Sequence, residues 1–323
     1  MGIDIGNESL PFFLAQPNIT LSNYPNKSND AEELVNDHGY RGKLIKVKRN
    51  SKKRILFLGE STTFGYGVSN SNNYIRILED SLNKKYDLEF INAGILGATS
   101  SEVLSNYIFK YKYYDPDIVV IKIGLNELDK FLYDNYQPDY SNFRNINFNI
   151  YELPTNSKYL LKSNFVSLIY IKLFVFPYFD NGFILSNESN QFNKKVNWFD
   201  SDINVLNKMH QNDYSYLAFY NNLKLMIEAI NQKKIILVTN NYNKDFSTHD
   251  NENFVFYKKM ISEYNKIIKD LSIEYQSGLI EIPNNAINVN LYLDDCHFNE
   301  KGHKIYANYY YPILENVLLS IKN

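Results

Sequence analysis

The chain has 323 residues and a mass of 37.9 kDa, which is enough to bury a substantial core in one large domain or two small ones. A formal net charge of −2 and a pI near 6.2 provide no basic excess for neutralising phosphates, so nucleic acid is not an expected partner. The single cysteine, Cys296, excludes an internal disulfide and any multi-cysteine zinc or iron–sulfur site.

The beginning of the chain predicts neither export nor lipid anchoring. Residues 1–16 lack the basic start, apolar stretch and cleavage site of a secretory signal, and Gly6 stands where myristoylation needs Ser or Thr. The longest apolar run, residues 165–179, is 15 residues long and contains Lys172 and Pro177, so it is too short and too interrupted to span a bilayer. We expect no transmembrane segment and, by default, a cytoplasmic location. An export signal upstream would change that location, and the sequence does not indicate an oligomeric state.

Aromatic residues are abundant, with 28 Tyr and 21 Phe. They are compatible with platforms on which sugar rings stack. A genome biased toward AT-rich codons would enrich Tyr and Phe together with Asn, Lys and Ile, and this explanation is favoured. Individual aromatic residues therefore carry little weight.

The N-terminal part of the chain differs from the rest. Residues 1–50 are polar, without sustained periodicity, and are expected to form an irregular arm packed on the domain. From Arg54 the pattern changes, because Ile55–Leu58 is a short apolar run typical of a strand buried on both faces of a parallel sheet. Apolar residues at helical spacing then predict a helix over Asn73–Lys84.

Strands and helices continue to alternate along the chain. The expected elements are a strand at Leu88–Ile91, a helix opened by the capping-box sequence Thr99–Glu102, a strand at Asp117–Ile123, a helix at Leu217–Ile230, a strand at Lys234–Thr239, a helix at Phe254–Leu271, a strand at Gly278–Ile282 and a helix from Asn299 onward. Pro312 is expected to restart that last helix. The alternation predicts an α/β sandwich around a mainly parallel sheet with right-handed crossovers.

We expect one domain over residues 51–323, interrupted once. Between about residues 131 and 213 the alternation gives way to sequence rich in aromatic residues and Asn. We interpret this stretch as an insertion at the edge or mouth of the sheet.

Polar clusters fall at the carboxyl ends of four predicted strands. They are Gly59–Gly65, Asn92–Gly97, Gly124–Glu127 and Asp294–Asn299. Ligands of open parallel sheets bind beyond these strand ends, so we expect the clusters to share one site. Gly-x-Ser alone is weak evidence for a catalytic serine, and Thr63 rules out the Gly-x-Ser-x-Gly elbow of α/β-hydrolases.

Together the four clusters resemble the conserved blocks of the SGNH (GDSL-like) hydrolase family. The resemblance extends from about Arg54 to the C-terminus apart from the insertion, and residues 36–42 look like a segment that precedes the first strand in some members. It implies a three-layer α/β/α sandwich with a flavodoxin-like sheet. By position, Ser61 matches the nucleophile, Gly97 and Asn126 match the glycine and asparagine of the family name, and Asp294 with His297 matches the last block.

These residues also form a chemically complete set. A serine hydroxyl must lose its proton to a base during attack, and His297 can accept the proton from Ser61. The imidazole needs a carboxylate to fix its tautomer, and Asp294, three residues earlier, can reach it. The expected oxyanion hole consists of the backbone N–H groups of Ser61 and Gly97 and the side-chain amide of Asn126.

Two residues depart from the family pattern. Glu60 stands where the first block usually has Asp, and Glu127 stands where the third block usually has Asp. Both changes keep the charge, so they weaken inference about the substrate more than inference about activity.

Nearby residues have simpler explanations. Asp295 competes with Asp294 as the acid but is expected to be a solvated loop charge, and Asn299 is expected to cap the last helix. His303 is expected to be a packing or surface residue, and Cys296 a small buried filler. Asn126 alone fits equally well a residue that satisfies backbone groups at a strand end.

The leading functional hypothesis is a serine esterase that removes acetyl or other short acyl groups from a carbohydrate. The alternatives are a lipid or thioester acylhydrolase, an acyltransferase that passes the acyl group to a sugar hydroxyl, and, least favoured, a non-catalytic binding protein. The expected partner is thus a small-molecule or carbohydrate acyl ester. We expect no cofactor and no metal, because serine chemistry needs none and no His or Cys cluster has ligand spacing.

Overall fold

The computed structural model describes residues 35–127, 214–231, 233–244 and 251–321. The predicted insertion at residues 131–213 and the first 34 residues of the predicted arm lie outside them. None of the helices within the described ranges is long and apolar enough to cross a membrane.

The core of the fold is a parallel sheet of five strands. In chain order these are β1 (Lys53–Gly59), β2 (Leu88–Gly94), β3 (Ile118–Lys122), β4 (Lys234–Val238) and β5 (Gly278–Ile280). Their spatial order is β2-β1-β3-β4-β5, and every neighbouring pair is parallel. The predicted flavodoxin-like α/β sandwich is therefore confirmed. In this order the chain switches direction across the sheet between β1 and β3, where ligands of such folds bind.

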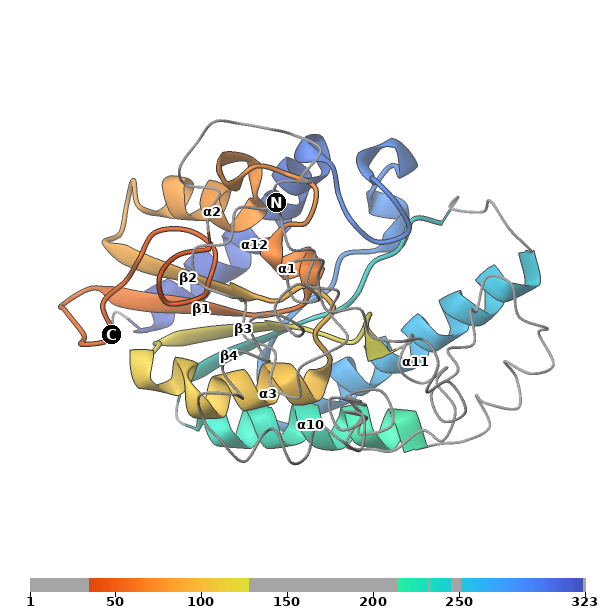
Figure 1. The fold of residues 1–323 in the computed structure, drawn as a ribbon, viewed down its shortest axis with the longest axis horizontal. Helices are drawn as coiled ribbons and strands as arrows, with labels where there is room; N and C mark the ends of the chain where they lie inside the picture. The colour runs from red at the N-terminus through yellow and green to blue at the C-terminus, as the bar shows by residue number, and fades with distance from the viewer. Residues whose placement is uncertain (1–34, 128–213, 232, 245–250, 322–323) are drawn as a thin grey trace, which may run out of the picture.

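Helices cover both faces of the sheet (Figure 1). One face carries α2 (Tyr74–Leu82) and α12 (Glu300–Ile321), which pack against each other. The other face carries α3 (Ser100–Phe109), α10 (Tyr214–Ile230) and α11 (Asn251–Glu274). These are the three layers that the resemblance implied.

Alternating side chains of each central strand enter two separate cores. In β1, Ile55 and Phe57 pack with α2 and α12, whereas Leu56 and Leu58 pack with the helices of the opposite face. Because successive side chains of a strand point to opposite faces, a strand covered on both sides needs an uninterrupted apolar run. This is why the apolar runs in the sequence located the strands.

Three predicted helix starts are confirmed by their caps. The Asn73 side chain accepts a hydrogen bond from the backbone N–H of Ile75 at 2.8 Å. The backbone N–H of Thr99 donates to the Glu102 carboxylate at 2.7 Å, as the capping box requires. Asn299 directly precedes α12, and its side chain accepts from the backbone N–H of Gly302 at 3.1 Å, as expected of an N-cap.

The expectation that Pro312 restarts the last helix is wrong. Helix α12 runs from Glu300 to Ile321 with Pro312 inside it. Proline removes one helical hydrogen bond and crowds the preceding turn, which normally kinks or ends a helix. Here Tyr310 and Leu314, on either side of the proline, are both fully buried in one core, and this packing stabilises a helix that continues through Pro312.

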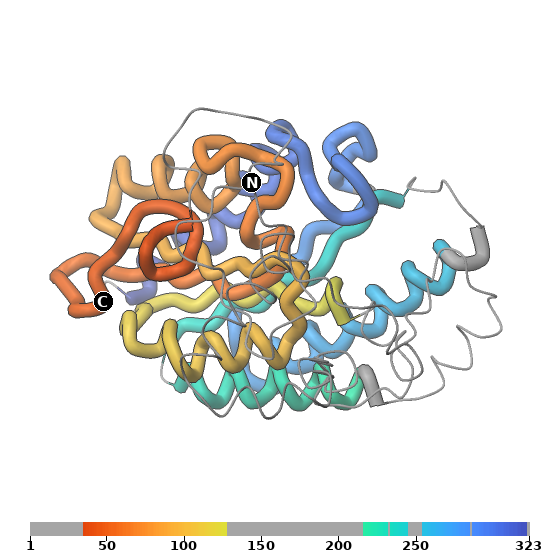
Figure 2. Tube along the Cα trace, in the orientation of Figure 1, coloured from red at the N-terminus to blue at the C-terminus, as the bar shows by residue number. Residues whose placement is uncertain are grey.

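The segment 35–50 runs beside β1 and β2 with isolated bridges instead of a helix or strand (Figure 2). Arg41 forms a bridge with Asn92 of β2, and its backbone N–H donates to the Asn92 carbonyl at 3.2 Å. The described part of the predicted arm is thus irregular and packed on the sheet.

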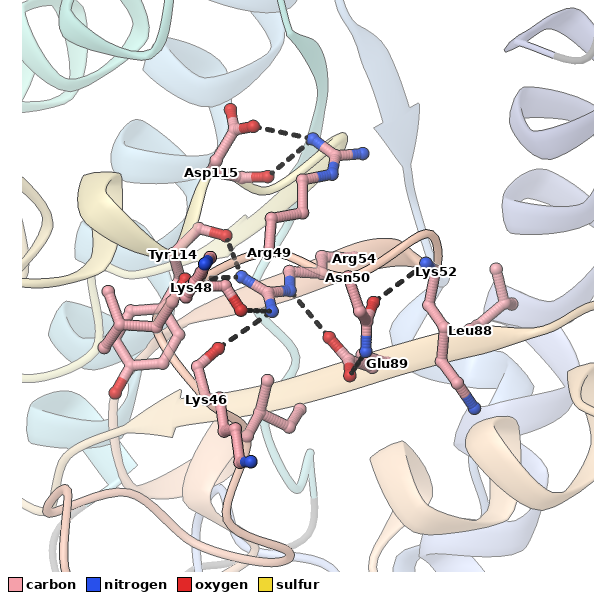
Figure 3. Close-up of polar contacts among 12 residues, drawn as sticks. Lys46, Lys48, Arg49, Asn50, Lys52, Arg54, Leu88, Glu89, Tyr114 and Asp115 are labelled. Atoms are coloured by element: carbon pink, nitrogen blue, oxygen red, sulfur yellow. Dashed lines mark hydrogen bonds and ion pairs between the residues drawn. The ribbon is translucent and has the colours of Figure 1, made fainter.

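A fully buried arginine fastens this segment to the amino-terminal end of the sheet (Figure 3). The Arg54 guanidinium donates to Glu89 of β2 at 2.6 Å. It also donates to the carbonyls of Lys46 at 2.8 Å, Val47 at 3.0 Å and Tyr114 at 2.6 Å. A buried guanidinium is tolerated because several acceptors replace its water.

We predict that Arg54→Met lowers the free energy of unfolding by about 3–5 kcal/mol, because it leaves Glu89 and four carbonyls, including that of Lys48 at 3.4 Å, without their donor. The control is Arg49→Met, which removes an arginine whose side chain is 33% exposed and paired with Asp115 and Asp117. This variant should lose less than about 1 kcal/mol. Urea unfolding of both variants measures the difference, and equal losses would contradict the anchoring role of Arg54.

Candidate active site

The polar clusters predicted from the sequence meet at the carboxyl end of the sheet. Immediately after β1, the short helix α1 (Ser61–Phe64) begins with Ser61. It packs directly on the end of β2, where a Cβ added to Gly94 would lie only 2.1 Å from the backbone nitrogen of Phe64. Glycine at this position is therefore required for α1 to sit over the sheet.

Ser61, His297 and Asp294 form a continuous chain of hydrogen bonds. The Nε2 atom of His297 lies 2.7 Å from Ser61 Oγ, and its Nδ1 atom lies 2.7 Å from Asp294 Oδ2. The other carboxylate oxygen of Asp294 accepts from the backbone N–H groups of His297 at 2.7 Å and Cys296 at 3.0 Å. An imidazole held in this way can take the serine proton while the carboxylate stabilises the imidazolium.

The environment of Asp294 favours its charged form. Burial opposes ionisation of this carboxyl, but the hydrogen bonds and charge of His297 outweigh burial and hold the pKa of Asp294 below its ordinary value. Asp294 is therefore a carboxylate at neutral pH, which is the state that can stabilise a protonated His297.

The expectation that Asp295 is a solvated loop charge is wrong. Its carboxylate accepts a hydrogen bond from the hydroxyl of Tyr257 on α11 at 2.9 Å, and its carbonyl accepts from the backbone N–H of Asn243 at 2.7 Å. Burial, together with the charge of Asp294, raises the pKa of Asp295. Asp295 thus fastens the loop of Asp294 and His297 to α11 and to the segment after β4.

Gly97 and Asn126 lie in the loops after β2 and β3. Gly97 has a φ of +67°, in the left-handed region that favours glycine. The side-chain nitrogen of Asn126 donates to the carbonyl of Ala98 at 2.9 Å, which uses one of its two hydrogens. Within the described residues, the backbone N–H groups of Ser61 and Gly97 make no hydrogen bond. The geometry is compatible with both explanations of Asn126, as a donor to an oxyanion and as a support for the neighbouring loop.

Arg41 from the N-terminal segment supports the loop after Ser61. Its guanidinium is buried and donates to the carbonyls of Phe64 at 3.0 Å, Gly65 at 2.8 Å and Val68 at 2.6 Å. The sequence resemblance included this residue in the segment 36–42 but did not predict these contacts.

Several residues at the site are not evident in the sequence. Lys122 is buried at the end of β3, and the signal that could have found it is a charged residue ending an apolar, β-branched strand. Tyr66 lies beside His297 with the ring centroids 4.8 Å apart. Tyr257 carries no recognisable signal, because its partner Asp295 is 38 residues away in the chain.

Asp294, Cys296 and His297 bring potential metal-ligand atoms within 4.8 Å of one another. Both ring nitrogens of His297 are already engaged, with Asp294 and Ser61. Burial raises the pKa of the Cys296 thiol well above its ordinary value, which disfavours the thiolate that binds metals. The hydrogen bonds of His297 to Asp294 and Ser61 thus account for this cluster better than a metal site does.

His303 and Cys296 are buried packing residues, as predicted. His303 stacks on Tyr74, and its Nδ1 atom accepts from the backbone N–H of Tyr74 at 3.3 Å. It lies on α12 and takes no part in the hydrogen bonds of Ser61 and Asp294.

Comparison with known proteins identifies the family. Residues 57–305 match the GDSL-like Lipase/Acylhydrolase family, so the chain belongs to this family, also called SGNH hydrolases. It is accordingly a carboxylic ester hydrolase, an esterase or acylhydrolase. Among curated proteins, none matches the chain.

Solved structures with similar architecture include esterases from several bacteria. A lipase/acylhydrolase from Enterococcus faecalis is 15% identical, with a TM-score of 0.47 over 82% of this chain and 96% of that chain. An acetyl xylan esterase variant from Geobacillus stearothermophilus is 16% identical, with a TM-score of 0.45 over 81% and 94%. A psychrotrophic esterase from Pseudoalteromonas sp. is 14% identical, with a TM-score of 0.42 over 83% and 99%.

We predict that His303 makes the protein less stable as the pH falls from about 6.5 towards 3. Burial, reinforced by the positive charges of Arg41, His297 and Lys122, lowers the pKa of His303 to about 3. Between the ordinary and the lowered pKa only the unfolded chain binds the proton, so stability falls by up to about 1.4 kcal/mol per pH unit.

Urea unfolding of wild type and His303→Gln between pH 4 and 7 measures this contribution. All other groups titrate in both proteins, so the difference between the two stability curves isolates His303. Parallel curves over this range would contradict a buried neutral histidine.

Proposed function

We propose that the protein is a serine esterase that works through a covalent acyl-enzyme, with Ser61 as nucleophile, His297 as general base and acid, and Asp294 as the carboxylate that orients the imidazole. The observation that carries this proposal is the pair of 2.7 Å contacts made by His297, one to Ser61 and one to Asp294. A serine used only as a helix cap has no need of an imidazole that is itself oriented by a carboxylate.

The proposed reaction has two halves. Ser61 Oγ attacks the ester carbonyl while its proton passes to His297 Nε2, and the resulting oxyanion is bound by the N–H groups of Ser61 and Gly97 and the amide of Asn126. The tetrahedral intermediate collapses, and His297 gives the proton to the departing alcohol. Water then attacks the acyl-enzyme, with His297 again taking its proton, and Ser61 is restored as the acid leaves.

For the substrate we propose an acetyl or other short acyl ester of a carbohydrate. Its support is that the hydrogen-bonded residues lie near the surface, with the Asp294 side chain 33% exposed, so a bulky alcohol can approach. The Tyr66 ring, 40% exposed beside His297, offers an aromatic face of the kind on which sugar rings stack. The predicted insertion, which also suggested a carbohydrate, lies outside the described residues.

A lipid or thioester acylhydrolase is the second candidate. Leu293, 48% exposed, lies against Gly67, next to Tyr66 in the chain, and this apolar surface would also suit a longer acyl chain. Transfer of the acyl group to a sugar hydroxyl would use the same acyl-enzyme. A non-catalytic binding protein is the least favoured alternative, because it would not need the hydrogen-bonded Ser61, His297 and Asp294.

The roles of the two adjacent aspartates give a matched test. Asp294→Asn should lower kcat on p-nitrophenyl acetate by roughly 10⁴-fold, because an amide no longer selects the tautomer in which His297 accepts the serine proton. Asp295→Asn should lower kcat less than about tenfold, since an amide oxygen can still accept from Tyr257. Ser61→Ala gives the residual turnover of p-nitrophenyl acetate by a protein that lacks the proposed nucleophile. Equal losses in the two aspartate variants, or full turnover by Ser61→Ala, would contradict the assignment.

Acyl-chain length separates the candidate substrates. We expect kcat/KM on p-nitrophenyl esters to be highest for acetate and to fall with chain length, and acetate to be released from acetylated oligosaccharides. Product analysis with a free sugar added should show acetate as the main product. A preference for long chains would favour the lipid candidate, and an acylated sugar product would favour transfer.

A further inference from the structure

Glu60 directly precedes Ser61, and its side chain extends into the loop that carries Asn126. Glu60 is fully buried, and its carboxylate accepts three consecutive backbone N–H groups at the end of β3. Gly124 donates to Oε1 at 2.7 Å, Leu125 to Oε2 at 3.1 Å and Asn126 to Oε1 at 3.4 Å. One side chain therefore joins the backbone of Ser61 to the backbone of Asn126.

A buried cation lies on the other side of Ser61. Lys122, at the end of β3, is 3% exposed, and its ammonium donates to Thr62 Oγ1 at 2.8 Å and to Asn240 Oδ1 at 3.4 Å. Thr62 directly follows Ser61. The contacts of Glu60 therefore fix the residue before Ser61, and the contact of Lys122 with Thr62 fixes the residue after it. The parallel register sets this arrangement, because Gly59 is paired with Lys122.

The two buried charges depend on each other. Burial and the neighbouring charge of Glu127 raise the pKa of Glu60 to about 8, while the backbone N–H groups of Gly124 and Asn126 and the charge of Lys122 oppose that shift. Burial likewise lowers the pKa of Lys122, and the charge of Glu60 opposes it. Each group therefore stabilises the charged form of the other through the low-dielectric interior. Removing either one therefore disfavours the charged form of the other.

We propose, on the basis of the esterase function above, that Glu60 is a positioning residue that sets the Asn126 amide relative to Ser61, with Lys122 as its buried counter-cation. The Asn126 side chain can stabilise an oxyanion only if it stands at a fixed distance from Ser61. The backbone N–H of Asn126 donates to Glu60, and the side-chain amide of Asn126 donates to the carbonyl of Ala98, so both parts of the residue are held in place. Glu60 touches neither substrate nor reacting atoms and acts only through Asn126.

Glu127, the other departure from the family blocks, makes a contact of the same kind. Glu127 is also buried, and its carboxylate accepts from the backbone N–H of Ser100 at 2.5 Å, at the start of α3. Both glutamates thus bind backbone N–H groups of the site's loops. Glu60 differs from Glu127 in spanning the nucleophile and the Asn126 loop, so substitution of Glu60 is the sharper test.

The test is a kinetic double-mutant cycle on p-nitrophenyl acetate with Glu60→Gln, Lys122→Met and the double variant. Glu60→Gln should lower kcat by roughly 100-fold with KM within about threefold, because a shifted oxyanion donor affects the transition state more than the bound substrate. Lys122→Met should also lower kcat. The double variant should lose less than the product of the two single losses, because it leaves no unpaired buried charge.

Two further variants separate positioning from folding. Glu60→Asp withdraws the carboxylate by one methylene but keeps both of its accepting oxygens. It should therefore retain more kcat than Glu60→Gln, in which one of the two oxygens is replaced by a donor. Glu89→Gln removes a charge paired with Arg54 at the opposite end of the sheet, and it should lower stability while keeping wild-type kcat. Affinity for a boronic acid, which forms a tetrahedral adduct with serine, should fall with kcat in the Glu60 variants.

The outcomes are distinguishable. Ser61→Ala with wild-type turnover would overturn the esterase function and this inference with it. An inactive Ser61→Ala combined with a Glu60→Gln variant that keeps wild-type kcat would overturn the positioning role alone. Multiplicative losses in the Glu60 and Lys122 cycle would overturn the pairing of the two charges.

Discussion

The hydrogen bond between His297 and Ser61 joins residues 236 positions apart in the chain, and the rest of the site depends on it. Ser61 is placed by the end of β1 in the middle of the sheet. His297 is placed by a closed loop, in which the backbone N–H of Leu293 donates to the His297 carbonyl at 2.7 Å and Tyr292 bridges Phe298. The next helix, α12, packs on the sheet face covered by α2. The distance between the two catalytic candidates is therefore a property of the whole sandwich.

Buried polar groups hold the loops at the strand ends in register. Backbone N–H and carbonyl groups in these loops lie outside the ladder of the sheet, and leaving them unsatisfied in the interior would be costly. Glu60 satisfies the loop after β3, Arg41 satisfies the turn after α1, and Asp295 links the last loop to Tyr257. Each of these side chains makes hydrogen bonds to specific backbone or hydroxyl groups, so their contacts are directional as well as stabilising. The loops at the candidate site are shaped by a few specific hydrogen bonds in addition to apolar packing.

Much of the fold is readable from local patterns. The strand runs, the helix that starts near Asn73, the cap at Asn299 and the capping box at Thr99 are consequences of neighbouring residues, and their predictions are confirmed. The proximity of Ser61 and His297 follows in part from placing Ser61 at a strand end, but His297 lies in the segment between β5 and α12 and not at a strand end. The prediction for Pro312 is wrong because tertiary packing on either side of it outweighs a local rule.

The supporting contacts are beyond local patterns. The sequence favours a solvated charge at Asp295 because its partner, Tyr257, comes from a helix whose facing residues the sequence does not specify. The roles of Glu60 and Lys122 require the strand register that sets Gly59 beside Lys122. Such contacts depend on which strand neighbours which, and that information is spread over the whole chain.

The most direct test of the site is covalent labelling with a p-nitrophenyl alkylphosphonate, followed by peptide mapping and a structure of the adduct. We expect one phosphonate per chain, on Ser61 Oγ, with its phosphoryl oxygen within hydrogen-bond distance of the N–H groups of Ser61 and Gly97 and the amide of Asn126. An adduct on another residue, or a phosphoryl oxygen turned away from these three donors, would contradict the proposed nucleophile or the proposed oxyanion hole.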